Sequence, residues 1–157
     1  MLARIFPRQF DNTYQGLWLA VWLFVPLMLV KAVQGVNSII MTRDVLIGAD
    51  GIPLDQYGAA AANTVVTLFA LLGMYLLIIP LQSLIVLIRY RSMIPFMYLS
   101  FIAVQVGARV LNTLHPIERP DGPPIGFTIN LILLALTLIG FALSVQDRSP
   151  QRVESTA

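Results

Sequence analysis

The stretch LFALLGMYLLIIPL, from Leu68 to Leu81, decides the fold class because it is apolar on every side. It lies inside a longer apolar run, about 60–88, and three more such runs occupy about 17–41, 93–114 and 125–146. About 20 helical residues, rising about 1.5 Å each, match a hydrocarbon core about 30 Å thick. Strands of a membrane barrel would instead alternate apolar and polar residues over about ten positions. The sequence therefore predicts an all-α bundle of four transmembrane helices.

The composition supports a membrane protein. Hydrophobic residues make up 57% of the 157 residues and charged residues 11%, whereas a soluble domain carries about a quarter charged residues. The segments between the runs are too short to fold alone, so we expect a single membrane domain over 1–157, with a disordered polar tail at 147–157. The net charge is only +2 and the basic residues stand beside the spans, which indicates a lipid bilayer and no nucleic acid as the partner.

The arginines outside the four runs are divided unequally between the two sides of the predicted bundle. One side has only Arg43 and Arg119. The other side has both tails and the second connecting segment, with Arg4, Arg8, Arg89, Arg91, Arg148 and Arg152. Because basic residues favour the cytoplasmic side, we predict that both termini are cytoplasmic. The expected location is the cytoplasmic (inner) membrane of a bacterium.

The first predicted outer loop, about 42–59, joins turn-forming residues to apolar ones. Gly48, Asp50-Gly51 and Pro53 favour turns. The apolar residues between them are Val45, Leu46, Ile47, Ile52 and Leu54. This pattern predicts a partly ordered loop that lies back on the membrane between the first two helices.

Amide and cationic side chains gather in the outer half of the predicted spans. Lys31 and Gln34 lie on one helix face, and Gln105 lies one turn from Arg109 on another. Lipid cannot satisfy such groups, and a charge near the bilayer centre costs about 3 kcal/mol on insertion scales, so these faces should point inward. The candidate ligand-binding residues are Lys31, Gln34, Asn63, Gln105, Arg109, Asn112 and Asn130.

The counter-ions of Lys31 and Arg109 must come from outside the spans, because no Asp or Glu lies within them. We expect the first outer loop to fold down and supply a carboxylate. The possible counter-ions are Asp44, Asp50 and Asp55. Alternatively, both cations extend to the outer interface unaided, or they serve as an anchor in a helix-packing network.

No pattern in the sequence indicates a catalytic residue, a cofactor or a metal site. Cysteine is absent, which excludes thiolate ligands and disulfides. His115 is the only histidine and has no Asp or Glu near it on its own predicted helix. Ala103 and Gly107 form a small-xxx-small pair, which is typical of close helix contacts.

Two loop motifs and the span count carry a resemblance to a known family. The motifs are GADGIPL at Gly48–Leu54 after the first span, and the short Gly/Asp-containing segment Pro120–Gly122 before the fourth. With four spans, the chain resembles the DoxX-like group of small bacterial membrane proteins, and also the bundle of vitamin-K-dependent carboxylase-type domains. Because DoxX-like proteins are generally subunits or accessory proteins, the resemblance implies an accessory role. It places no catalytic residue here, and the carboxylase-type lysine chemistry is not transferred to Lys31.

The function expected first is therefore that of a non-catalytic accessory or structural subunit, which packs against itself or a larger membrane complex. The alternative is a binder or carrier of a lipophilic or anionic ligand, such as a lipid or a quinone, at the outer-half polar cluster. A membrane enzyme that acts on a lipid-soluble substrate is the third possibility.

Overall fold

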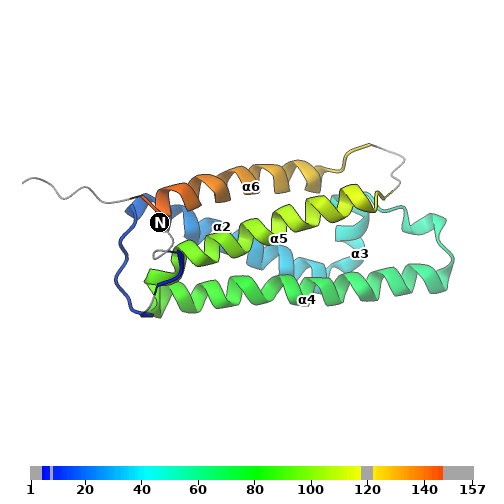
Figure 1. Ribbon diagram of the computed structural model, residues 1–157. Coiled ribbons are helices and arrows are strands. Elements are labelled where there is room, and N and C mark those ends of the chain that lie inside the picture. The colour runs from blue at the N-terminus through cyan, green and yellow to red at the C-terminus, as the bar shows by residue number, and fades with distance from the viewer. Residues whose placement is uncertain (1–4, 8, 118–121, 147–157) are drawn as a thin grey trace, which may run out of the picture.

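Four long helices form the bundle (Figure 1): α2 (Trp18–Ile40), α4 (Ala59–Arg89), α5 (Ile94–Leu114) and α6 (Ile125–Ser144). The computed structural model describes residues 5–7, 9–117 and 122–146, and this part of the chain contains no strand. All four helices are long and apolar enough to cross a membrane. The prediction of an all-α bundle with four long apolar helices is thus confirmed, with bounds that differ from the expected ones by at most two residues. The expected disorder of 147–157 lies outside the described residues.

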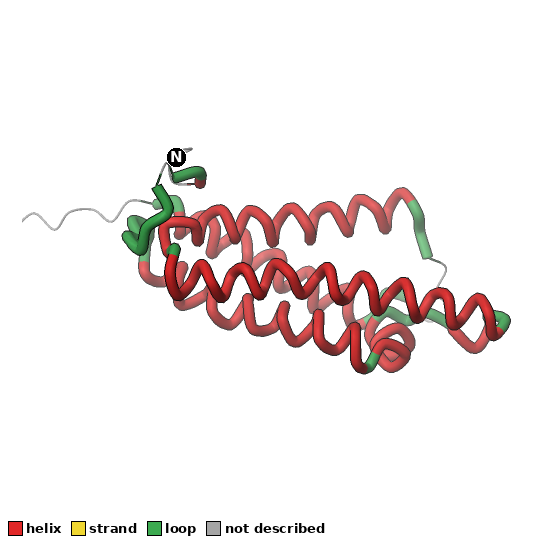
Figure 2. Tube along the Cα trace, turned by 90° about the horizontal axis from the view of Figure 1, so that it is seen from below, coloured by secondary structure: helices red, strands yellow, loops and turns green. Residues whose placement is uncertain are grey.

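The helices follow one another around the bundle. Helix α2 packs between α4 and α6, and α5 contacts both α6 and α4. The chain enters α2 and leaves α6 at the same end, where the amide of Leu17 donates to the carbonyl of Leu143 at 3.3 Å. We call this the terminal end of the bundle. The opposite end, where the short helix α3 (Thr42–Asp44) lies, is called the loop end (Figures 1 and 2).

The main apolar core occupies the terminal half of the bundle. Its centre is Tyr98, which is fully buried and packs edge-on against Phe24 with ring centroids 5.1 Å apart. The Tyr98 hydroxyl donates to the carbonyl of Ala20 at 2.6 Å, and Gly140 of α6 lies against the ring. The core residues are Ala20, Val21, Phe24, Leu27, Val86, Ile94, Met97, Tyr98, Phe101 and Leu133. Helix α5 contributes to this core only with residues 94–101, its first two turns.

Two glycines bring α2 and α4 together nearer the loop end. A Cβ on Gly73 would lie 2.7 Å from the Cβ of Ser38, and one on Gly35 would lie 3.2 Å from the Cα of Leu77. Small residues at such positions allow two membrane helices to approach closely, so that van der Waals contacts stabilise the pair. Helices α2 and α4 therefore stay packed beyond the apolar core.

The segment between α2 and α4 is folded into short helical turns. After α3 come a π-helical turn, η1 (Val45–Ala49), and a 3-10 turn, η2 (Leu54–Gln56). Three of its apolar side chains are buried against α4, namely Leu46, Ile52 and Leu54, which contact Val65, Val66 and Phe69. We call this segment, 42–57, the cap. Its position outside the membrane, and the cytoplasmic location of the termini, remain predictions.

The chain before α2 crosses the turn between α4 and α5. The Ser92 hydroxyl donates to the carbonyl of Asp11 at 2.9 Å, and the Asp11 amide donates to the same hydroxyl at 3.2 Å. The Arg91 guanidinium lies over the Trp18 ring at 5.9 Å. These contacts fasten the N-terminal segment across the terminal end.

Candidate functional site

Lys31 links α2 to α6 in the loop half of the bundle. Its Nζ donates to Oε1 of Gln34 and to Oδ1 of Asn130, both at 2.9 Å. Gln34 follows Lys31 by one turn on α2, whereas Asn130 stands in the second turn of α6. An ammonium group has three protons to donate, so these two amide oxygens leave one proton for a further acceptor.

Arg109 lies near this link, on α5. Its side chain is half-buried and its Cζ stands 5.1 Å from the ring centroid of Phe127, in the first turn of α6. A guanidinium over an aromatic face is attracted by the ring without being neutralised. Because Phe127 and Asn130 are three residues apart on α6, Arg109 and Lys31 reach the same stretch of that helix.

The carboxylates expected to balance these charges have other positions. Asp44 and Asp55 are exposed on the cap. Asp50 lies beside the start of α6, its Oδ1 3.3 Å from the place of a Cβ on Gly126. In the described part of the chain, no ion pair joins Lys31 or Arg109 to any of these residues. The two cations instead have neutral partners, amide oxygens for Lys31 and an aromatic ring for Arg109.

Gln105 lies one turn before Arg109 on α5, and only 9% of its surface is exposed. Its Nε2 donates to the Thr137 hydroxyl at 3.1 Å and to the Phe101 carbonyl at 3.3 Å. Its Oε1 is enclosed by protein atoms and has no hydrogen-bond partner among the residues that the structure describes. An unsatisfied buried acceptor costs about 1–3 kcal/mol, so this oxygen is a place where a donor would be favourable.

Two candidate residues lie apart from this group. Asn63, in the second turn of α4, is exposed and accepts a 2.9 Å hydrogen bond from Nη2 of Arg43 on α3. Asn112 is exposed near the end of α5. The structure therefore groups Lys31, Gln34 and Asn130, and Arg109 reaches the same stretch of α6 from the neighbouring helix. We call these four residues the cationic cluster; Gln105 lies one turn deeper on α5 and bonds to Thr137 of α6.

Sequence reasoning missed Phe127 as a partner of the cationic cluster. Phe127 precedes Asn130 by three residues, so the two side chains share a face of α6. This spacing could have predicted that Phe127 lies near Asn130. Aromatic residues are so common in membrane spans, however, that Phe127 was not chosen as a candidate.

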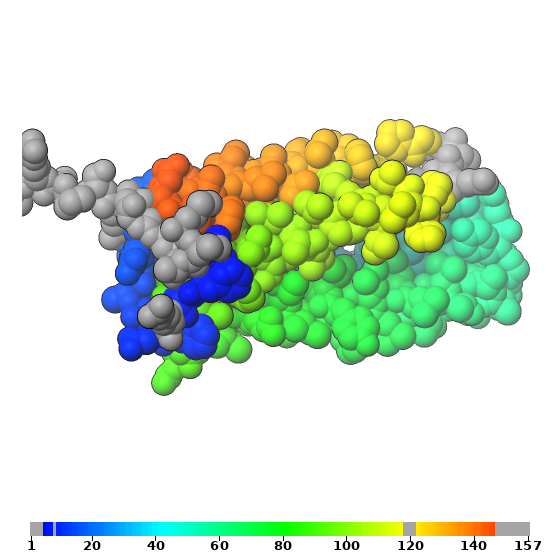
Figure 3. Space-filling model, in the orientation of Figure 1, coloured from blue at the N-terminus to red at the C-terminus, as the bar shows by residue number. Residues whose placement is uncertain are grey.

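The loop half of α5 is loosely packed. Between Ile102 and Leu114, Gln105 is the one buried residue, and a Cβ on Gly107 would meet nothing within 4 Å. Figure 3 shows a hollow between α5 and α4 toward the loop end, with α2 visible behind it. The cationic cluster thus lies in the half of the bundle that is most open on the α5 side.

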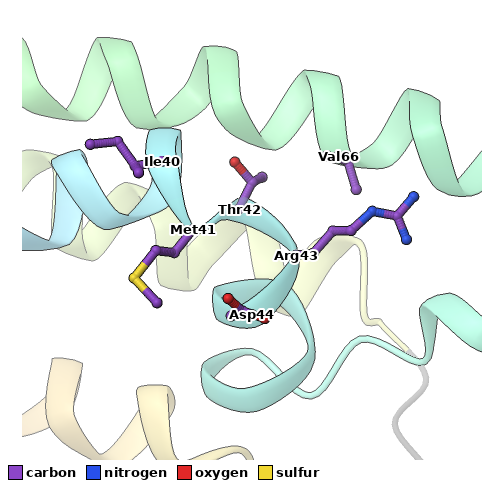
Figure 4. A pocket seen from close by; sticks show the side chains of 6 residues that line it. All are labelled: Ile40, Met41, Thr42, Arg43, Asp44 and Val66. Carbon is purple, nitrogen blue, oxygen red and sulfur yellow. The ribbon is translucent and has the colours of Figure 1, made fainter.

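A second, shallow hollow lies at the surface beside α3 (Figure 4). It is lined by Ile40, Met41, Thr42, Arg43, Asp44 and Val66. The Thr42 hydroxyl donates its hydrogen bond to the carbonyls of Ser38 and Ile39, and the Arg43 guanidinium donates to the side-chain oxygen of Asn63. This hollow shares no residue with the cationic cluster. Among the described residues, no group of three His, Cys, Asp or Glu side chains could hold a metal ion.

The cationic cluster has the chemistry of an anion site. An ammonium acts as a compact point charge, and a guanidinium presents a planar fork of donors that fits phosphate and carboxylate oxygens. Neither group has a neutralising partner among the described side chains. No protein-family model, curated protein or solved structure matches this chain.

Proposed function

We propose that this protein binds an anionic amphiphile within the membrane, with the charged head at Lys31 and Arg109 and the apolar chain beside α5. One observation carries the proposal: Lys31 bonds to Asn130 and Arg109 stands over Phe127, three residues away on α6, and both of these partners are neutral. This makes the ligand-binding alternative of the sequence analysis the best-supported function.

The electrostatics favour an anion between the two groups. Like charges repel strongly where water is scarce, and the hydrogen bonds from Lys31 to amide oxygens solvate its charge without cancelling it. A phosphate or carboxylate would attract both cations and accept the remaining proton of Lys31. The Coulombic attraction would be stronger than at a water-exposed site, because the effective dielectric constant is lower.

The packing of α5 supports access from the lipid. Every α5 residue from Val106 to Leu114 is half-buried or exposed, Arg109 included. An apolar chain could lie there while its head reaches the cations. If the predicted orientation holds, the ligand belongs to the outer leaflet of the membrane.

The test measures binding of a simple charged amphiphile to the purified protein. Hexadecyl phosphate is compared with hexadecylphosphocholine, which has the same chain and a zwitterionic head, by native mass spectrometry. The variants are Lys31→Met and Arg109→Gln, and the control is Arg89→Gln, an exposed arginine at the terminal end. Loss of one charge-assisted hydrogen bond should weaken hexadecyl phosphate binding roughly 10- to 100-fold in the two cluster variants and leave the control unchanged. Equal affinity in all folded variants would contradict the proposal.

The second candidate is the accessory subunit implied by the DoxX-like resemblance. The observation that favours it is the open face of α5 at Ala103 and Gly107, where a partner helix could approach closely. Gentle extraction from the native membrane, followed by mass spectrometry of the intact assembly, separates the two. A stoichiometric partner protein of another sequence supports the subunit, whereas a retained amphiphile without such a partner supports the binder. Conversion of the ligand, lost with Arg109→Gln, would favour the enzyme.

A further inference from the structure

We infer that two copies of this chain pair in the membrane through the outer face of α4, with their Gln82 side-chain amides hydrogen-bonded to each other. This inference concerns assembly and does not depend on the anion site. It rests on two polar side chains that α4 directs away from its own bundle, Tyr75 and Gln82.

The part of α4 that matches the hydrocarbon core is almost entirely apolar on its outer face. Residues 68–88 rise about 30 Å along the helix axis, which is the thickness of that core. Every exposed side chain in this stretch is apolar except Tyr75 and Gln82. Neither of these two has a hydrogen-bond partner within the part of the chain that the structure describes. Both therefore need a partner from outside the bundle.

Lipid is a poor partner for Gln82. The residue stands seven positions, or about 10 Å, before Arg89 at the end of α4, so its amide lies among acyl chains when Arg89 is at the membrane surface. Acyl chains offer no donor or acceptor, and an unpaired amide among them costs free energy. Amide side chains in such positions hold membrane helices together by hydrogen bonds between them. Gln82 therefore favours the approach of another helix.

The bundle itself cannot supply that helix. The buried residues of α4 at this depth, Pro80, Ser83 and Val86, lie on its other face. Turning Gln82 toward the bundle would require α4 to rotate and to expose them.

Tyr75 and Gln82 lie on one line along the helix. They are seven residues apart, which is close to two full turns. They belong to a row of exposed residues at alternating spacings of three and four, the spacing at which one helix packs along another. This row, which we call the α4 stripe, consists of Leu68, Leu71, Tyr75, Ile78, Gln82 and Ile85. Any exposed helix face contains such a row, but this one contains both polar side chains.

A second copy of the chain fits the α4 stripe best. Copies of one chain have the same distribution of basic residues and thus enter the membrane in the same orientation. Two α4 helices that meet along their stripes then run parallel about a two-fold axis, and each residue faces its own counterpart. Gln82 faces the partner's Gln82, and an amide both donates and accepts, so the pair is self-complementary. The two Tyr75 hydroxyls meet in the same way.

This dimer leaves the anion site of each copy open. Helix α2 packs between α4 and α6, and Figure 1 shows α4 and α6 on opposite sides of the bundle. The cationic cluster lies on α2, α5 and α6, and none of its residues belongs to the α4 stripe.

The experiment uses thiol cross-linking, because the chain has no cysteine of its own. Ile85→Cys and Ile78→Cys each place one thiol in the α4 stripe. The matched control is Leu84→Cys, since Leu84 is 44% exposed and Ile85 56%, at almost the same depth but about 100° apart around the helix. The full-length variants are oxidised with copper phenanthroline in the native membrane, and the disulfide-linked dimer is measured on non-reducing gels.

The two stripe variants should form the dimer and Leu84→Cys should not. Equal cross-linking at positions 84 and 85, no cross-linking at either stripe position, or linkage to a different protein would overturn pairing through this face.

The role of the amide is tested by adding Gln82→Leu to Ile85→Cys. Because Gln82 is exposed, this change leaves the packing within one copy intact. In reconstituted vesicles of increasing lipid content, the protein density needed for half-maximal cross-linking should rise about 3- to 30-fold, the effect of one interhelical hydrogen bond. An unchanged density would overturn the pairing of the two Gln82 amides.

Discussion

Replacing Gly140 by alanine should destabilise the bundle, because the new methyl group would occupy space filled by the Tyr98 side chain. A Cβ at this position would overlap the Tyr98 hydroxyl and lie 2.5 Å from Cε1 and Cζ, where carbon atoms ordinarily stand about 3.5–4.0 Å apart. The ring is fully buried and held by its 2.6 Å hydrogen bond to Ala20, so relief requires α5 and α6 to separate or that bond to break. Overpacking costs about 1–3 kcal/mol and the lost hydrogen bond about 1 kcal/mol more. We expect a total loss of about 2–4 kcal/mol.

The assay is equilibrium unfolding of the detergent-purified protein in mixed micelles of increasing SDS content, followed by circular dichroism. The matched control is Gly107→Ala, because a Cβ there meets nothing within 4 Å. The intrinsic helix preference of alanine over glycine, about 1 kcal/mol, applies to both variants and cancels in the comparison. Adding Tyr98→Phe to Gly140→Ala should recover part of the loss, since it removes the overlapped hydroxyl. Equal stability of Gly140→Ala and Gly107→Ala would refute the close approach of α5 and α6 at Tyr98.

Two further predictions concern the ends of the bundle. Leu46→Ala removes a fully buried side chain of the cap, so the cap should lose about 2–4 kcal/mol of local stability. In reconstituted vesicles, protease should therefore cut the cap of this variant faster than that of the wild-type protein. An unchanged cleavage rate would show that the cap does not depend on its packing against α4. At the terminal end, hydrogen bonds from the Thr13 side chain, the largest cause, and from backbone amides hold the pKa of Asp11 below its usual 3.8. The pKa of Asp11 is lower in the folded state than in the unfolded state. The ionised carboxylate therefore stabilises the folded protein above pH 3.8, and this stabilisation disappears as the pH falls through the folded-state pKa. An NMR titration of the carboxyl checks this, and a pKa at or above 3.8 would contradict the contact.

The positions of the four helices could be predicted from the sequence far better than the contacts within the cationic cluster. A run such as Leu68–Leu81, which is apolar on every side and lies in a stretch of more than about 20 apolar residues, predicts a long membrane-type helix from length and hydropathy alone. The pairing of Lys31 with Gln34 follows from their spacing on one helix. The bond from Lys31 to Asn130 joins residues 99 positions apart, and its geometry depends on how α2 packs against α6. From the sequence, charge balance predicted a carboxylate partner for Lys31. The convergence of two amide oxygens, from Gln34 and Asn130, on its ammonium group depends on helix packing and could not be read from the sequence.

The uneven packing of the bundle gives Lys31 a second role. Helices in lipid gain little from the hydrophobic effect and associate through close packing and hydrogen bonds. The terminal half has such packing around Tyr98, whereas in the loop half α6 is joined to α2 by the bond from Lys31 to Asn130. An anion that uses the remaining proton of Lys31 leaves that link in place. An anion that displaces Asn130 exchanges an interhelical bond for a ligand bond, so its affinity is reduced by the free energy of separating α6 from α2. The proposed function therefore predicts that ligand binding is coupled to the packing of α6 against α2 through the ammonium group of Lys31.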